Sequence, residues 1–365
     1  MMRLPLLDAN DPKAIDVEQV KKMVDMCFEN GITYFDCATM YHAYACEGVV
    51  KEALTSRYPR ESFKLANKFH TAYANTPEGM EEHFNKQLEN CGVEYFDNYL
   101  IHGINMERYQ AYKKLGAFDW IMEKKKEGKV RKAGFSFHAD ADLLEDILKN
   151  YPKMDFVQLQ LNYMDWDSAA IQAKRCHDLA VKYGKEIIVM EPIKGGILTK
   201  LPDDAFAPLK ACQPSWSQAE WALKFVANEE NVITVLSGMS DLAQMKQNIA
   251  ALEGFEKLTE AESAAVSEAA KILKASNAIA CTACSYCTPG CPQNIPIPKY
   301  FALYNAISSK GGEGSRVTTT FFYKDLSSKF GKASGCIECG QCEEICPQKL
   351  PIIENLKKVA KEYEK

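Results

Sequence analysis

Hydrophobic and polar positions alternate along residues 17–253 in two regular patterns. Amphipathic segments with a helical period are followed by short apolar runs rich in β-branched residues, and this order repeats along the chain. The first amphipathic segment, residues 17–30, gathers its apolar side chains on one face and ends before Gly31, a residue type that commonly closes helices. Repeated helix and strand patterns of this kind predict an α/β fold built around a parallel sheet.

Seven apolar runs are the predicted strands. They cover residues 32–37, 63–68, 96–102, 130–137, 155–161, 186–191 and 232–237. A closed (β/α)₈ TIM barrel needs eight strands, so the predicted fold is this barrel with its first strand apparently missing from the chain. Residues 1–7 resemble the loop that would leave strand one. We therefore expect two sheet edges without a partner, and the sequence suggests a truncated start as the explanation.

The composition of the chain changes after residue 258. A helical pattern covers residues 258–275, and beyond it proline, glycine and cysteine become frequent around short helical stretches. These changes predict two domains, a barrel over residues 1–258 and a smaller domain over residues 259–365. Residues 308–316, rich in glycine and serine, are predicted to form a surface loop within the second domain.

Charge and hydropathy exclude several classes of protein. The net charge is −5 and the basic residues are dispersed, so a nucleic-acid-binding surface is not expected. No apolar run reaches the length of about 18 residues that a membrane span requires. The N-terminal residues lack the basic and apolar regions of a secretory signal, which predicts a cytoplasmic protein. In that compartment its 14 cysteines should stay reduced, which favours metal binding or redox chemistry over disulfides.

Eight of these cysteines form two copies of the motif C-x2-C-x2-C-x3-C-P. The copies are Cys281, Cys284, Cys287 and Cys291, and Cys336, Cys339, Cys342 and Cys346. This spacing is typical of two-cluster bacterial ferredoxins, in which the fourth cysteine of each motif binds the other cluster. The motifs predict two [4Fe-4S] clusters in an α-helical, ferredoxin-like domain, with Cys346 and Cys291 exchanged between them. Zinc sites and disulfides are the alternatives, although neither requires the C-x3-C-P ending.

Four polar residues occur at or just beyond the ends of predicted strands. Asp36 lies at the end of the first predicted strand, Tyr41 lies in the loop just beyond it, Lys68 ends the second, and His102 ends the third. In a barrel, the carboxyl ends of the strands surround the active site. Taken singly, these residues have ordinary structural interpretations as a cap, a rim aromatic, a solvated charge and a core histidine. Their common placement favours a catalytic group.

These four residues resemble the catalytic tetrad of the aldo/keto reductases in their order along the chain, their placement at strand ends and their spacing. The resemblance covers residues 1 to about 255. It implies that Tyr41 gives a proton to a substrate carbonyl as hydride arrives from NADPH or NADH. Lys68 would lower the pKa of Tyr41, Asp36 would hold Lys68, and His102 would orient the carbonyl.

The same resemblance implies a set of cofactor-binding residues. They are Ser136, Gln158, Glu191, Pro192, Ile193, Gly195, Gly196, Ser237, Gly238, Met239, Ser240, Gln244, Gln247 and Asn248. Gly238 and Gln244 occupy the positions where NADPH-specific members carry a lysine and an arginine that bind the 2′-phosphate. The choice between NADP(H) and NAD(H) therefore stays open.

The two parts together resemble aldo/keto reductases with a C-terminal 4Fe-4S dicluster domain. This resemblance implies an oxidoreductase that acts on a small carbonyl or alcohol, and ferredoxin or a flavoprotein is the expected kind of electron partner. Two alternatives remain: an electron-transfer or nucleotide-binding subunit without carbonyl turnover, and clusters that serve only to stabilise a small domain.

Overall fold

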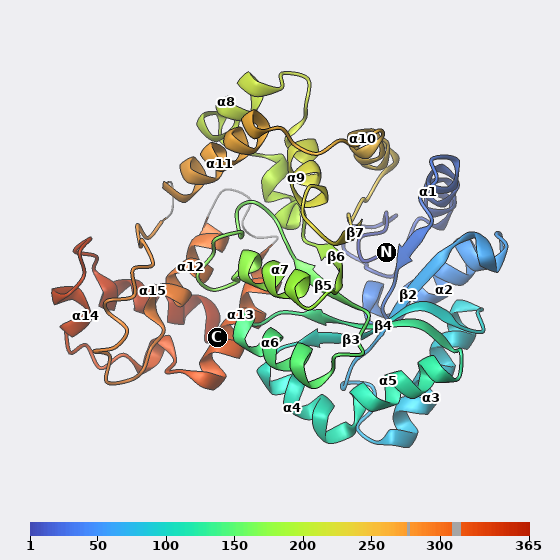
Figure 1. Ribbon diagram of the computed structural model, residues 1–365, viewed down its shortest axis with the longest axis horizontal. Helices are drawn as coiled ribbons and strands as arrows, with labels where there is room; N and C mark the ends of the chain where they lie inside the picture. The colour runs from blue at the N-terminus through green and yellow to red at the C-terminus, as the bar shows by residue number, and fades with distance from the viewer. Residues whose placement is uncertain (276–277, 309–314) are drawn as a thin grey trace.

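The computed structural model describes residues 1–275, 278–308 and 315–365, and its centre is a parallel sheet (Figure 1). The described residues form seven strands that pair in sequence order from β1 to β7. Their bounds are β1 Tyr34–Asp36, β2 Lys64–Phe69, β3 Phe96–Ile104, β4 Val130–Phe137, β5 Phe156–Gln160, β6 Glu186–Met190 and β7 Val232–Val235. Each predicted apolar run overlaps one of these strands, and β2 and β3 extend one and two residues beyond their runs. The α/β prediction is confirmed, as is the barrel with one strand missing.

Helices cover the outside of the sheet, and most residues of β2 to β6 are buried, whereas those of β7 are partly buried or exposed. The helices are α1 Val17–Glu29, α2 Cys46–Val50, α3 Pro77–Cys91, α4 Met106–Leu115, α5 Ala117–Lys126, α6 Ala141–Asn150, α7 Ala173–Lys182, α8 Asp203–Cys212, α9 Gln218–Ala227, α10 Leu242–Leu252 and α11 Glu260–Ala275. All five residues of β5 are buried. Beside it, Gly134 is required in β4, because a Cβ there would lie 2.6 Å from the carbonyl oxygen of Phe156.

Polar caps set the points where several helices begin. The side chains of Asp16, Thr76, Asn105 and Asp140 accept backbone hydrogen bonds at the starts of α1, α3, α4 and α6. Such bonds satisfy amides that have no partner within the helix. Asn105 and Asp140 follow the ends of β3 and β4, so these caps also fix how the chain turns at the catalytic end of the sheet.

The first four residues contact both flanks of the incomplete barrel. The amino group of Met1 donates a hydrogen bond to the carbonyl oxygen of Asp36 at the end of β1. On the other side, the carbonyl oxygen of Arg3 accepts a bond of 3.1 Å from the Ser240 hydroxyl, just after β7. β1 and β7 do not pair with each other. The N-terminal segment therefore crosses the place where the ends of these two strands face each other.

The C-terminal residues form a separate helical lobe to one side of the barrel (Figure 1). It contains α12 Ile297–Ser308, α13 Arg316–Lys329, α14 Gln341–Glu344 and α15 Ile352–Tyr363. The preceding helix, α11, packs on α8 of the barrel. The proposed boundary between residues 258 and 259 stays a prediction. Most of the predicted surface loop, residues 308–316, lies outside the described residues.

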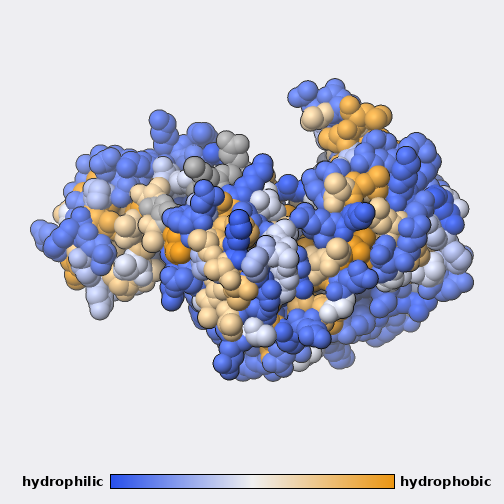
Figure 2. All heavy atoms as spheres, turned by 90° about the horizontal axis from the view of Figure 1, so that it is seen from above, coloured by the Kyte–Doolittle hydropathy of each residue, from blue (hydrophilic) through white to orange (hydrophobic). Residues whose placement is uncertain are grey.

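Seen from above, the two lobes carry a largely hydrophilic surface with hydrophobic residues in small groups (Figure 2). No helix in the described parts of the chain has the length and apolar character needed to cross a membrane.

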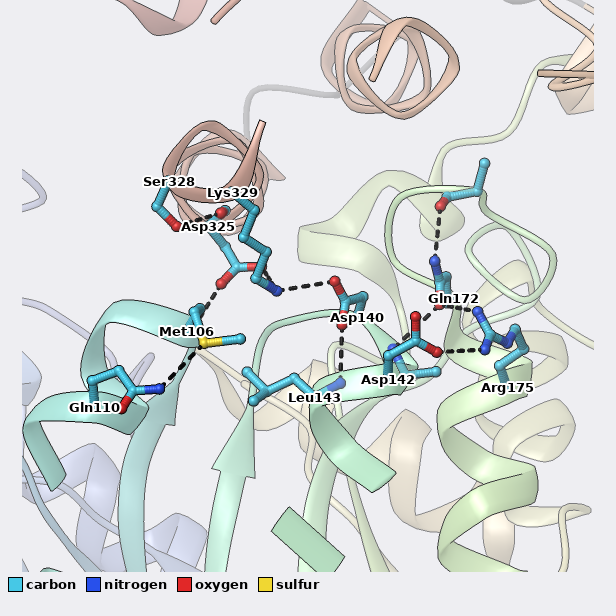
Figure 3. A network of polar contacts seen from close by, with 12 residues as sticks. Met106, Gln110, Asp140, Asp142, Leu143, Gln172, Arg175, Asp325, Ser328 and Lys329 are labelled. Atoms are coloured by element: carbon cyan, nitrogen blue, oxygen red, sulfur yellow. Dashed lines mark hydrogen bonds and ion pairs between the residues drawn. The ribbon is translucent and has the colours of Figure 1, made fainter. Parts of the chain in front are cut away.

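Helix α13 joins the C-terminal lobe to the catalytic end of the barrel (Figure 3). The buried Asp325 carboxylate accepts a 2.6 Å hydrogen bond from the backbone N–H of Met106, the first residue of α4. Lys329 lies 3.1 Å from Asp325 and 3.0 Å from Asp140, the cap of α6. Because α4 and α6 follow β3 and β4, the lobe is anchored beside the carboxyl ends of these strands.

We expect Asp325→Ala to loosen this anchor. The substitution would leave the Met106 N–H without its acceptor and remove one of the two carboxylates around Lys329. Losing a buried acceptor of this kind costs roughly 1–3 kcal/mol. Hydrogen exchange of α4 and the urea midpoint would measure the effect. Lys324→Ala, at an exposed position on the same helix, is the control. Equal protection of α4 in both variants would contradict this account of the interface.

Candidate active site

Lys68 is the centre of the polar cluster at the catalytic end of the sheet. Its ammonium nitrogen lies 2.5 Å from Asp36 Oδ1, 2.7 Å from the carbonyl oxygen of Cys37 and 3.2 Å from the Tyr41 hydroxyl. The Lys68 side chain is almost fully buried. The Tyr41 and His102 rings meet edge to face with centroids 6.4 Å apart. The four predicted catalytic residues therefore converge in the structure.

Burial and charge act in opposite directions on this cluster. Burial lowers the pKa of Lys68, but Asp36 and Tyr41 raise it more in sum, so the pKa lies above its ordinary value and the ammonium form is kept. Burial raises the pKa of Tyr41, and the Lys68 charge opposes this only in part. The expected net lowering of the Tyr41 pKa is not found. Tyr41 is instead held as a protonated phenol that can act as a proton donor.

Three histidines face the same end of the barrel. His102 belongs to β3, His70 follows β2, and His138 follows β4. The centroids of the His70 and His102 rings lie 5.9 Å apart. Burial, followed by the positive charge of Arg108, lowers the pKa of His70 and of His138 to about 4. Burial also lowers the pKa of His102 well below its ordinary value, and Lys68 adds to this effect. All three imidazoles are neutral at pH 7.

The neutral histidines give an expected pH dependence of stability. Their pKa is depressed on folding, so between pH 6.5 and about 4 the unfolded chain binds protons that the folded chain does not. The free energy of unfolding should therefore decrease as pH falls from 6.5. Urea unfolding at pH 7.5 and 5.5 would measure the change. His70→Asn keeps an acceptor for the Ala72 amide and should reduce the dependence; an unchanged slope would contradict this assignment.

A buried polar network holds the backbone at Lys68. Glu47 accepts hydrogen bonds from Thr39, Asn67 and Gln87 through Oε1, at 2.7, 3.0 and 3.2 Å. Gln87 also donates to the carbonyl oxygen of Lys68 at 3.0 Å. These bonds fix the end of β2 and hence the direction of the Lys68 side chain.

Most of the predicted cofactor residues lie in the carboxyl-terminal part of β4 or in the segments after β6 and β7, whereas Gln158 lies in the middle of β5, and Gln244, Gln247 and Asn248 lie on α10. Ser136 in β4 accepts a hydrogen bond of 2.7 Å from the Gly103 N–H. On the neighbouring strand β5, the buried Gln158 Oε1 has no hydrogen-bond partner among the described residues. A buried acceptor without a partner is costly unless a ligand satisfies it. The carboxamide N–H of a nicotinamide is a donor of the required kind, so the residues present fit this group.

The loop after β6 carries an unusual backbone and a buried ion pair. Glu191 and Lys194 have positive φ angles of 57° and 47°, and Gly195 and Gly196 continue with 63° and 101°. Pro192 and Ile193 lie between them. The Lys194 ammonium pairs with the buried Asp165 carboxylate, which also accepts a 2.8 Å bond from Gln160. Sequence reasoning missed Asp165 and its pairing with Lys194, since the two residues are 29 positions apart.

The segment between β7 and α10 contains the remaining predicted residues. Ser237 accepts a 2.9 Å hydrogen bond from Asn248. The Ser240 amide donates to Gln244 at 2.9 Å. The side chain of Arg3 packs against Gly238, where an added Cβ would lie 2.8 Å from it. Met239 lies in the same segment, and Gln247 lies on α10. The structure thus brings Arg3, which sequence reasoning also missed, to this part of the barrel rim.

The eight motif cysteines surround two cavities in the C-terminal lobe. One cavity is lined by Cys281, Cys284, Cys287 and Cys346. The other is lined by Cys291, Cys336, Cys339 and Cys342. The fourth cysteine of each motif lies at the other motif's cavity, as the crossed pattern requires. Ile297 lines both cavities, so they are neighbours.

The donor set of each cavity fits a cluster of several iron atoms. In the described part of the chain, no three His, Cys, Asp or Glu side chains are grouped closely enough to hold a single metal ion. The four thiols are instead spread around the wall of each cavity. Four cysteine thiolates around one space are the ligand set of a [4Fe-4S] cluster.

Comparison with known proteins agrees with this geometry. The model of the aldo/keto reductase family matches residues 7–271. The chain belongs to the aldo/keto reductase family. A 4Fe-4S dicluster domain model matches residues 280–350 of this aldo/keto reductase, which covers both cysteine motifs. The family and the iron-sulfur domain predicted from sequence are therefore confirmed.

Relatives of this aldo/keto reductase are similar over the barrel. An oxidoreductase of Bacillus subtilis, YqkF, is 24% identical over 66% of this chain and 84% of its own. The NADH-specific methylglyoxal reductase of Escherichia coli is 25% identical over 67% of this chain and 85% of its own. An aldo/keto reductase of Klebsiella pneumoniae, solved with NADP and acetate, is 19% identical, with a TM-score of 0.58, over 72% of this chain and 89% of its own. The chain is thus an NAD(P)-dependent oxidoreductase by family.

Proposed function

We propose that this chain reduces a small carbonyl compound with NADH or NADPH and that Tyr41 is the proton donor. The observation that carries the proposal is the contact of 3.2 Å between the Lys68 ammonium and the Tyr41 hydroxyl, with Asp36 2.5 Å from the same ammonium. The bound nicotinamide supplies hydride to the carbonyl carbon. Every other part of the proposed step is assigned to side chains of this chain.

Tyr41 gives its hydroxyl proton to the carbonyl oxygen, which becomes the hydroxyl of the alcohol product. The phenolate that remains lies beside the Lys68 ammonium, and this charge stabilises it. Asp36 holds the ammonium in place. His102 is neutral and half-buried, so it can donate one hydrogen bond to the carbonyl oxygen without competing as an acid. Solvent then returns a proton to Tyr41.

The proposed dinucleotide site extends from Ser136 and Gln158 to the segment between β7 and α10. Titration of the protein with NADH and NADPH, followed by nucleotide fluorescence, tests it without turnover. Gln158→Leu should weaken binding of both nucleotides, because it removes the acceptor proposed for the carboxamide. Equal binding by the variant and the parent would exclude Gln158 from the site. The ratio of the two affinities measures the preference that Gly238 and Gln244 leave open.

We further propose that the C-terminal lobe holds two [4Fe-4S] clusters with crossed ligation. The observation that supports this is the distribution of four cysteines around each cavity. Such clusters pass single electrons, whereas hydride carries two together, so electron exchange would involve a partner such as ferredoxin or a flavoprotein. Anaerobic purification should give about eight iron atoms per chain and a [4Fe-4S] EPR signal after reduction.

An electron-transfer subunit without carbonyl turnover is the second candidate. The docking of α13 beside the catalytic end of the barrel favours it, because this contact couples the cluster lobe to the nucleotide-binding part. An anaerobic assay of NADH and NADPH oxidation against a panel of aldehydes and ketones separates the two candidates. Nucleotide-dependent cluster reduction without alcohol formation would favour the subunit. We expect the protein in the cytoplasm, where its free thiols would stay reduced.

A further inference from the structure

Arg108 stands out among the arginines because it is partly buried and has no carboxylate partner among the residues that the structure describes. It lies in the first turn of α4, where Nη1 donates a 3.1 Å hydrogen bond to the carbonyl oxygen of Gly103. The arginines with an acidic partner in the described parts of the chain are Arg57, Arg60, Arg131, Arg175 and Arg316. Arg3 also lacks one there, but it is exposed. Arg108 therefore holds a positive charge in a partly buried place, with no carboxylate at ion-pair distance among the described residues.

The surroundings of Arg108 place this charge at the catalytic end of the barrel. Its charge acts on His102 and also on His70 and His138, and it lowers the pKa of each. Its guanidinium carbon lies 4.6 Å from the centroid of the Phe321 ring, which belongs to α13 of the cluster lobe. The His138 ring stacks on the same phenyl ring at 6.0 Å. The cluster lobe thus holds the guanidinium beside the three histidines.

One buried polar atom beside Arg108 also lacks a hydrogen bond. His138 Nδ1 is buried and has no hydrogen-bond partner among the described residues. The histidines next to Arg108 are neutral, so they add hydrogen-bonding capacity without adding negative charge. Burial disfavours the charged form of Arg108 and lowers its pKa. A desolvated cation without a counter-ion is costly, and an anionic ligand removes that cost.

We propose that the substrate carries an anionic oxygen group, a carboxylate or a phosphate, in addition to its reacting carbonyl, and that Arg108 binds this group. A guanidinium presents several N–H donors in one plane, which matches the oxygens of both groups. The inference rests on the proposed carbonyl reduction and names its substrate class. Arg108 is then a specificity residue, and Phe321 of the cluster lobe is a positioning residue that acts through it.

Matched pairs of substrates test the proposal in the intact, cluster-containing protein. Succinic semialdehyde is compared with butanal, and glyceraldehyde 3-phosphate with glyceraldehyde. The parent should favour the anionic member of at least one pair, and the pair concerned distinguishes carboxylate from phosphate. In Arg108→Met, kcat/KM for that anionic substrate should fall at least about tenfold, with a change of less than about threefold for its neutral analogue. An equal loss for both members would overturn the proposal.

Three further variants complete the test. Arg131→Met removes an arginine at the opposite end of β4, where the side chain is 61% exposed, and should leave the substrate preference unchanged. Phe321→Leu should weaken the preference for the anionic substrate through KM, because the guanidinium loses the ring against which it lies. If Arg108→Met does not fold, Arg108→Lys retains the charge and should keep part of the preference. A complete absence of preference in the parent would overturn the proposal by itself.

A binding measurement separates failure of this inference from failure of the proposed function. Calorimetry of succinate or inorganic phosphate with the Tyr41→Phe protein requires no turnover. The double variant Tyr41→Phe with Arg108→Met is compared with Tyr41→Phe alone. Anion binding that is at least about tenfold weaker in the double variant supports the anion site, even if no carbonyl is reduced. The opposite result is carbonyl reduction that depends on Tyr41 and anion binding that does not depend on Arg108. It would support the proposed reaction and overturn the anion site.

Discussion

Tyr41→Phe is expected to lower kcat/KM for carbonyl reduction by about 10²–10⁴-fold, with nicotinamide binding unchanged. The substitution removes one hydroxyl, the group that contacts the Lys68 ammonium at 3.2 Å. A positioned general acid typically contributes an acceleration of this size. The ring of Tyr41 packs against the barrel core, and phenylalanine keeps these contacts. Steady-state rates and nucleotide fluorescence on the same preparation would measure both effects.

Tyr44→Phe is the matched control for this experiment. Tyr44 lies three residues later in the same short helical segment, but it is exposed, and no contact between its hydroxyl and Lys68 is found. Its variant should retain nearly the full rate. If Tyr41→Phe also retained it, Tyr41 would not be the proton donor, and the candidate without carbonyl turnover would gain support.

Pairs of cysteine substitutions are expected to separate crossed from uncrossed ligation. In the crossed arrangement, Cys346 shares a cavity with Cys287 and not with Cys339. The double variant of Cys346→Ser with Cys287→Ser should therefore lose one cluster and keep about four iron atoms. Cys346→Ser with Cys339→Ser should damage both clusters and keep fewer. Iron and sulfide analysis with EPR after reduction would measure the outcome.

The uncrossed arrangement predicts the reverse order of the two double variants. In that case Cys346 and Cys339 would bind the same cluster, and their double variant would be the one that keeps about four iron atoms. Cys212→Ser is the control, because this partly buried thiol belongs to α8 of the barrel and lines neither cavity. Its iron content should equal that of the parent. Zinc in place of iron would remove the electron-transfer part of the proposal.

The C-terminal lobe and the barrel are connected by contacts near the proposed catalytic residues. α13 supplies Phe321 to the guanidinium of Arg108, and Asp325 to the start of α4. A cluster lobe that only stabilised itself would not need to lie beside the catalytic end. The arrangement instead makes this lobe part of the wall near the reacting groups, so substitutions on α13 should change substrate preference.

The sequence by itself determined the features that depend on local patterns. Apolar periodicity located every strand within a few residues, because a buried parallel strand requires an apolar run whatever its neighbours are. Cysteine spacing determined the type of cofactor, because the ligands of one motif lie close together in the chain. The convergence of Asp36, Lys68 and His102 also followed from the sequence, since the ends of parallel strands meet at one face.

The tertiary structure decided the features that join distant segments. Arg108 and Phe321 are 213 positions apart, Asp165 and Lys194 are 29 apart, and no local pattern marks either pair. The same holds for Arg3 at the segment after β7. The net electrostatic effect on Tyr41 was likewise inaccessible from sequence, because a nearby lysine was visible but the degree of burial was not. Burial and long-range contact depend on how the whole chain packs, and that information exists only in the folded molecule.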